Sequence, residues 1–200
     1  EQLRAAGVEA DFVAGHSLGE YAALVYAGVL GFEQALVTVH KRGLYMDQAV
    51  PAGEGAMAAI LSMDASDLKS VCQEVSETGH PVQLANINCP GQIVISGTVE
   101  GINKACEELK AAGAKRALPL KVGGAFHSPL MNPAKVKLEK AIEETTFHTP
   151  KCPVYQNVDA LPHTNPEEIK ANLVAQLTAS VRWTQSVKNM ISDGATNFTE

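Results

Sequence analysis

The chain has 200 residues, 46% of them hydrophobic and 19% charged, and its formal net charge at pH 7 is −6. This composition is typical of a globular protein with one substantial core, or a core and a small subdomain. The negative charge and the lack of basic runs argue against nucleic-acid binding. No apolar stretch approaches the length of a membrane span and no signal peptide is apparent, so we expect a cytoplasmic protein without a membrane partner.

A nucleophile elbow is predicted near the start of the chain. The apolar residues before Gly15 indicate a buried strand, and the spacing after Gly19 indicates a helix. Between them stands Gly15-x-Ser17-x-Gly19, a pattern that places a serine on a sharp strand-to-helix turn. We expect both glycines to be required by the turn and Ser17 to have a strained backbone. Such a serine is a candidate nucleophile toward a carbonyl carbon.

The second predicted helix spans about 32–46, and we expect one buried face on it, made of Phe32, Leu36, Val39 and Gly43. Arg42 lies near the C-terminal end of this helix, where a cation already interacts favourably with the helix dipole. From spacing alone, Arg42 is therefore interpreted as a routine arginine near a helix C-terminus.

Residues 56–122 have a rhythm of their own. Strand and helix patterns alternate there in the order βαββαβ, with a turn at Cys89-Pro90-Gly91-Gln92 between the middle strands. This order is that of a ferredoxin-like unit. We therefore predict an α/β fold with two lobes: a hydrolase-like, mostly parallel sheet core formed by 1–55 and 123–200, and a ferredoxin-like subdomain inserted at 56–122. A cleft between the lobes is the expected substrate site.

A serine nucleophile needs a base within hydrogen-bonding reach, and His127 is the best candidate. It lies in a Gly-rich connection where the inserted unit ends, and that connection should border the cleft. His16 is adjacent to Ser17 and should point away from it. The remaining histidines are expected in loops or at a helix surface; they are His40, His80, His148 and His163.

No carboxylate stands where a third member of a catalytic triad is expected, because the acids between Ser17 and His127 fall mainly on polar faces of the inserted unit. A serine–histidine dyad held by a neutral acceptor fits better. The cysteines are scattered without C-x-x-C spacing, and no residues have metal-ligand spacing, so we expect neither a metal nor another cofactor.

Taken together, these residues resemble the malonyl-CoA:acyl carrier protein transacylases. The resemblance rests on five segments in order: Gly15-His16-Ser17-Leu18-Gly19-Glu20-Tyr21, Lys41-Arg42-Gly43, Asn88 to Gly97, Ala125 to Met131, and Gln176-Leu177 with Val181-Arg182-Trp183. It implies a malonyl-serine intermediate at Ser17, with His127 as base and the amide of Leu18 as one oxyanion donor. It further implies that Arg42 binds the malonyl carboxylate and that Gln176 helps to hold the histidine. Phe126 would exclude methyl-branched acyl units.

The resemblance implies malonyl-CoA and an acyl carrier protein as partners, and we expect a monomer. Because carrier proteins are usually acidic, a local basic patch should receive them, and its candidates are Lys115, Arg116 and Lys121. The family begins with a strand and a Gly-Gln-Gly loop that supplies the second oxyanion amide, and neither precedes Ser17 here. The family's glycine- and proline-containing continuation after Glu200 is also absent. We therefore expect the given sequence to be incomplete at both ends, or else poorly active and poorly folded when isolated.

Three alternatives stay open. A serine hydrolase or thioesterase shares the elbow but has no need of Arg42. An acyltransferase domain excised from a larger synthase would show the same motifs, in fatty acid or polyketide synthesis. A non-catalytic module that retains the fold is disfavoured by the intact Ser17 and His127.

Overall fold

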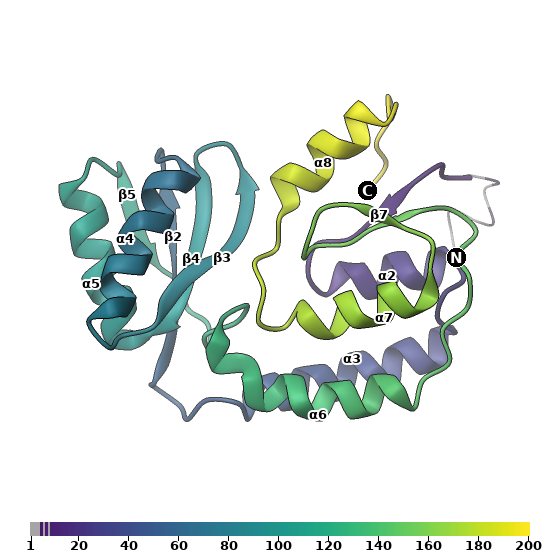
Figure 1. The fold of residues 1–200 in the computed structure, drawn as a ribbon, viewed down its shortest axis with the longest axis horizontal. Coiled ribbons are helices and arrows are strands. Elements are labelled where there is room, and N and C mark those ends of the chain that lie inside the picture. The colour runs from purple at the N-terminus through teal and green to yellow at the C-terminus, as the bar shows by residue number, and fades with distance from the viewer. Residues whose placement is uncertain (1–4, 6, 8) are drawn as a thin grey trace.

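The computed structural model describes residues 5, 7 and 9–200, and it has an α/β fold in two parts (Figure 1). We call residues 55–119 the small lobe and the rest of the described chain the large lobe. Figure 1 shows the small lobe on the left and the large lobe on the right, with β3 as the small-lobe strand beside the large lobe.

The small lobe is a four-stranded sheet covered on one face by two helices. Its elements in chain order are β2 (Gly55–Leu61), α4 (Ala65–Glu77), β3 (Val82–Cys89), β4 (Gln92–Thr98), α5 (Val99–Ala111) and β5 (Arg116–Pro119). The strand order is β3-β4-β2-β5 and all neighbours are antiparallel. The order βαββαβ is thus the one that the sequence pattern predicts.

Apolar side chains on the two helices explain why they cover this sheet. Leu68 of α4 and Leu109 of α5 are fully buried and pack with Ile95 of β4 in one cluster. Thr98 begins α5 by accepting a hydrogen bond from the Gly101 amide. The opposite face of the sheet carries a smaller cluster of Met57, Ala85 and Val94.

The large lobe has helices around a small sheet. Its elements are β1 (Val13–Ala14), α2 (Gly19–Tyr26), α3 (Phe32–Asp47), the 3-10 helix η1 (Pro129–Met131), α6 (Asn132–Glu143), β6 (Val154–Tyr155), β7 (Pro162–His163), α7 (Pro166–Ala175) and α8 (Trp183–Ser192). In Figure 1, α3 and α6 lie side by side beneath α2 and α7. Leu24, Leu138 and Leu173 are fully buried in the cluster between these helices.

The prediction of a mostly parallel core sheet is wrong for the described strands. β1 pairs in parallel with β6, but β6 pairs with β7 in antiparallel orientation. The chain passes from β6 to β7 through 156–161 alone, and so short a connection allows only an antiparallel neighbour. The core sheet is therefore mixed.

The buried face of α3 also differs from the predicted one. Phe32 and Leu36 are 62% and 60% exposed, whereas the buried positions are Ala35, Thr38, Arg42 and Met46. This rotation places Arg42 in the interior of the large lobe.

Two features join the lobes. Phe126 packs against the large-lobe cluster and also against the Met57 cluster of the small lobe. The chain around Val181 extends the β3 edge by a parallel bridge with Asn86, and Val181 exchanges backbone hydrogen bonds with Ala85 and Ile87.

Among the described helices, none is both long and apolar enough to cross a membrane.

Candidate active site

Ser17 stands on the turn between β1 and α2, in a left-handed backbone conformation with φ of 51°. A Cβ on Gly15 would lie 2.0 Å from the backbone carbonyl of Gly19, so the close approach at this turn requires glycine. A Cβ on Gly19 would meet nothing within 4 Å. The sequence-based explanation for the two glycines is therefore right for Gly15 and wrong for Gly19.

Ser17 and His127 come together although 110 residues separate them, with 2.7 Å between Oγ and Nε2. The other ring nitrogen, Nδ1, lies 2.9 Å from the backbone carbonyl oxygen of Gln176. A carbonyl can only accept, so Nδ1 carries the proton and Nε2 of the neutral ring has the lone pair. This is the arrangement that a general base for Ser17 needs.

His127 itself is 3% exposed. Burial disfavours the charged imidazolium and lowers the pKa of His127 to about 4, with the charge of Arg42 acting in the same direction. The hydrogen bond to the Gln176 carbonyl opposes this shift. The ring is therefore neutral, and able to accept a proton, at neutral pH.

Arg42 reaches the same point from α3. Its Nη2 donates to Ser17 Oγ at 2.9 Å and to the side-chain oxygen of Gln176 at 3.2 Å. The guanidinium lies over the ring of Tyr21, 5.8 Å from the centroid, a distance at which a cation–π interaction is favourable. Its buried Nε has no hydrogen-bond partner among the described residues.

No carboxylate of the described chain forms an ion pair with Arg42. Burial lowers the pKa of Arg42, while the neighbouring Tyr21 and Glu20 act in the opposite direction. An almost fully buried cation without a paired anion is costly, and an incoming carboxylate would relieve that cost. The interior position of Arg42 beside the serine makes it a candidate anion-binding group, a role that spacing alone does not predict.

Gln176 makes its contacts in two ways. Its backbone carbonyl faces His127, while its side-chain amide donates to the Ser17 carbonyl at 3.1 Å. The amide of Leu18, the expected oxyanion donor, takes part in none of the hydrogen bonds found in the described chain. Leu18 is the N-cap of α2, so this amide lies at the positive end of the helix dipole.

Sequence reasoning missed the residue that holds the elbow, Asn157. Its Oδ1 accepts from the Ser17 amide at 2.7 Å and its Nδ2 donates to the Gly15 carbonyl at 2.8 Å. Glu20 in turn accepts from the Asn157 amide at 2.8 Å and is fully buried. Burial raises the pKa of Glu20, and the hydrogen bonds from Asn157 and Gln156 oppose that shift. The sequence pattern places Asn157 inside a predicted strand at 154–158 and gives no signal for this role.

His16 points away from this group, as expected. Its Nε2 lies 2.9 Å from the side-chain oxygen of Asn88, and its ring meets Trp183 edge-on. In the described part of the chain, no three histidine, cysteine or acidic side chains are grouped so as to hold a metal.

Comparisons with known proteins agree with this geometry. The family model described as "Acyl transferase domain" matches residues 1–200. The malonyl CoA-acyl carrier protein transacylase of Bacillus subtilis is 52% identical over the whole chain, which covers 63% of that protein, and that of Escherichia coli is 47% identical over 94% of the chain and 60% of its own length. The chain thus spans about three-fifths of these relatives.

Solved structures give the same picture. An acyl carrier protein S-malonyltransferase from Vibrio cholerae matches with a TM-score of 0.94 at 44% identity, covering 97% of this chain and 63% of the other. A malonyl-transacylase in complex with a type II PKS acyl-carrier protein matches with a TM-score of 0.93 at 44% identity, over the same shares. The chain belongs to the acyl transferase domain family.

Proposed function

We propose that this chain carries the catalytic centre of an enzyme that transfers a malonyl group from malonyl-CoA to the phosphopantetheine thiol of an acyl carrier protein. One observation supports the proposal above all: the unpaired, buried guanidinium of Arg42 lies 2.9 Å from the serine that His127 can deprotonate. A planar guanidinium can hold a carboxylate through two parallel hydrogen bonds. The relatives named above are transacylases of this kind.

The proposed first half-reaction transfers the acyl group to the enzyme. Ser17 Oγ attacks the thioester carbonyl while His127 Nε2 takes its proton. The amide of Leu18 donates to the oxyanion of the tetrahedral intermediate. The C–S bond then breaks, and the coenzyme A thiolate receives the proton from His127.

In the proposed second half-reaction the carrier-protein thiol gives its proton to His127 and attacks the malonyl ester. The C–O bond to Ser17 breaks and the serine takes the proton back. Coenzyme A enters as a substrate, and neither a metal nor another cofactor takes part in these steps. The same steps serve fatty acid or polyketide synthesis.

The domain division and the finer fold are part of the proposal. We assign 1–55 and 123–200 to a hydrolase-like core and 56–122 to an inserted ferredoxin-like subdomain. The two separate hydrophobic clusters and the βαββαβ order support this division.

All four cysteines are unpaired, which favours a reducing compartment such as the cytoplasm. The monomeric state stays a prediction.

A labelling experiment tests the proposal. Incubation of the full-length protein with radiolabelled malonyl-CoA should leave label on Ser17, and Ser17→Ala should retain none.

A kinetic experiment tests the role of Arg42. Arg42→Ala should lower kcat/KM for malonyl-CoA by about 10- to 100-fold, since it removes a charge-assisted contact, with a much smaller effect on acetyl transfer.

Other outcomes would overturn it. Label retained by Ser17→Ala would exclude the serine as acyl carrier. Equal losses for malonyl and acetyl groups in Arg42→Ala would remove the carboxylate-binding role. Free malonate as the main product, with carrier protein present, would identify a thioesterase instead.

A further inference from the structure

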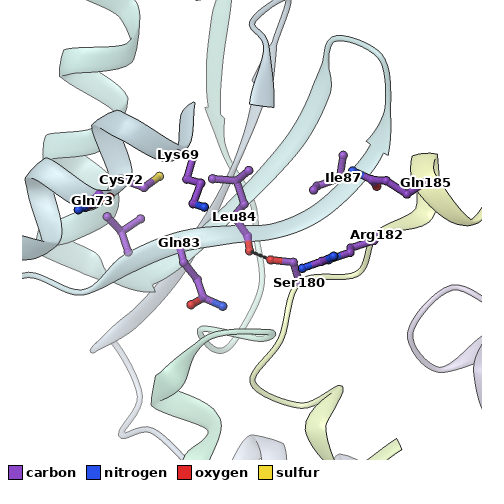
Figure 2. A pocket seen from close by; sticks show the side chains of 10 residues that line it. Lys69, Cys72, Gln73, Gln83, Leu84, Ile87, Ser180, Arg182 and Gln185 are labelled. Atoms are coloured by element: carbon purple, nitrogen blue, oxygen red, sulfur yellow. Dashed lines mark hydrogen bonds between the residues drawn. The ribbon is translucent and has the colours of Figure 1, made fainter. Parts of the chain in front are cut away.

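Gln83 is a small-lobe residue whose side chain reaches the catalytic histidine. It lies on β3 and borders a pocket of about 390 Å³ that Lys69, Cys72 and Arg182 also line. Figure 2 shows that the Gln83 side chain points away from Lys69 and Cys72, toward the segment that leads into α6. That segment contains His127.

One amide nitrogen of Gln83 holds two backbone carbonyls. Nε2 donates to the His127 carbonyl at 2.7 Å and to the Thr178 carbonyl at 3.0 Å. His127 has a left-handed backbone with φ of 56°, a conformation that persists only where surrounding contacts fix it. Thr178 follows, by two residues, the Gln176 whose carbonyl orients the imidazole.

Gln83 thus ties the backbone of His127 to the segment two residues beyond Gln176, the residue whose carbonyl orients the imidazole ring. The ring and its acceptor come from chain segments about fifty positions apart, and one side chain of the other lobe holds a backbone carbonyl in each segment, those of His127 and Thr178. Glutamine suits this position because its amide group offers two N–H donors. Glutamate at neutral pH has no donor and would face two carbonyl oxygens.

We propose that Gln83 is a positioning residue that aligns His127 with Ser17, so that the small lobe is part of the catalytic apparatus. This inference rests on the proposed malonyl transfer. A shift of about 1 Å in a catalytic group can reduce the rate about 100-fold. Because Gln83 makes no contact with Arg42, its loss should lower kcat and leave KM for malonyl-CoA nearly unchanged.

The test uses the full-length protein with Gln83→Leu and Gln83→Glu, and Gln73→Leu as matched control. Gln73 lies on α4 of the same lobe, is exposed, and donates a side-chain hydrogen bond to Glu77 on the same helix. Active sites are titrated by malonyl labelling, so that misfolded protein does not count. We expect kcat per active site to fall about 10- to 100-fold in Gln83→Leu and further in Gln83→Glu, with Gln73→Leu unchanged.

A second readout separates positioning from stability. Imidazole ¹⁵N NMR should show the His127 Nδ1–H resonance of the wild type shifted or broadened in Gln83→Leu and preserved in Gln73→Leu. A wild-type kcat and unchanged His127 resonances in Gln83→Leu would overturn the inference, as would a lowered Tm with unchanged kcat per site. If the wild type formed no malonyl-serine, the proposed function would fail, while the NMR comparison would still decide the role of Gln83.

Discussion

Burial of the His127 imidazole determines how the reaction should respond to pH. The folded protein lowers the pKa of this ring from 6.5 to about 4, mainly by removing it from water. Above that pKa the ring is neutral and Nε2 can take the proton of Ser17. The group is therefore usable as a base over a wider acidic range than an exposed histidine.

The rate should depend on pH through the protonation of His127. We expect kcat/KM for malonyl-CoA to stay constant from about pH 8 to about pH 5 and to fall below about pH 5 as His127 is protonated, since this parameter reports ionisations of the free enzyme. A loss of half of kcat/KM near pH 6.5 would contradict the burial argument.

The stability of the fold should change with pH in the same direction. As pH falls, the unfolded chain protonates His127 near pH 6.5, before the folded protein does, so the contribution of His127 to the free energy of unfolding declines as pH falls from 6.5 toward 4.

Among single residues, the sequence predicted a functional role only for those that belong to a recognisable local motif. Ser17 was identified from its flanking glycines and His127 from its place in a Gly-rich connection. Asn157 and Gln83 have no such pattern, because their partners are 140 and 44 residues away. An amide in a strand or at its end has the same sequence signal whether it faces solvent or a catalytic group.

Among the elements, α3 shows why helical spacing misled the interpretation of Arg42. Apolar residues occupy more than one side of this helix, so periodicity alone does not fix which side is buried. The buried stripe includes Thr38 and Arg42, which a search for apolar positions leaves out. The resemblance to a family assigned Arg42 to the substrate, and that assignment stays a prediction.

The elbow gives a matched pair of substitutions. Gly15→Ala places a methyl group 2.0 Å from the Gly19 carbonyl carbon, so the turn must open and Ser17 must move. We expect a Tm lower by several degrees and at least a 100-fold loss of serine labelling, by analogy with other misplaced catalytic groups. Thermal unfolding and labelling with malonyl-CoA measure the two effects.

Gly19→Ala is the control at the other end of the same motif. Its new methyl group would meet nothing within 4 Å, and alanine has a higher helix propensity than glycine. The Tm of Gly19→Ala should therefore be unchanged or slightly raised. A loss of stability in Gly19→Ala equal to that in Gly15→Ala would show that the close approach is not the reason for the first glycine.

For the whole molecule, charge is unevenly distributed. Residues 109–138 contain six lysines and arginines and no aspartate or glutamate, although the chain has a net charge of −6. Lys115, Arg116 and Lys121 are exposed, and none forms an ion pair with a described residue. Residues 116–127 run from β5 to His127, so we expect this surface to receive an acidic carrier protein, which must deliver its thiol to Ser17.

Charge reversal tests this surface. Arg116→Glu combined with Lys121→Glu should raise KM for the carrier protein about tenfold or more at low salt, with a smaller effect at high salt where charges are screened. Lys140→Glu on α6, also exposed, should leave that KM unchanged. Unchanged carrier-protein kinetics in the double variant would exclude this docking surface.

The architecture as a whole was partly predictable. The βαββαβ order follows from local periodicities between 55 and 119, so it could be predicted residue by residue. The mixed core sheet could not, because the apolar pattern before Gly15 indicates a strand but gives neither the partner nor the direction of short strands such as Val13–Ala14 and Val154–Tyr155. Their pairing depends on contacts between distant segments.

The sequence separation within the site has a consequence for synthesis of the protein. Asn157 and Gln176 follow Ser17 by 140 and 159 residues. At about 5–20 residues per second, a ribosome finishes the elbow motif roughly 7 to 30 s before it adds these residues. During that interval the nascent chain lacks Asn157, whose side chain holds the turn at Ser17, and Gln176, whose carbonyl orients the imidazole of His127. We therefore expect Ser17 to react with thioesters only after the chain beyond Gln176 has emerged and folded.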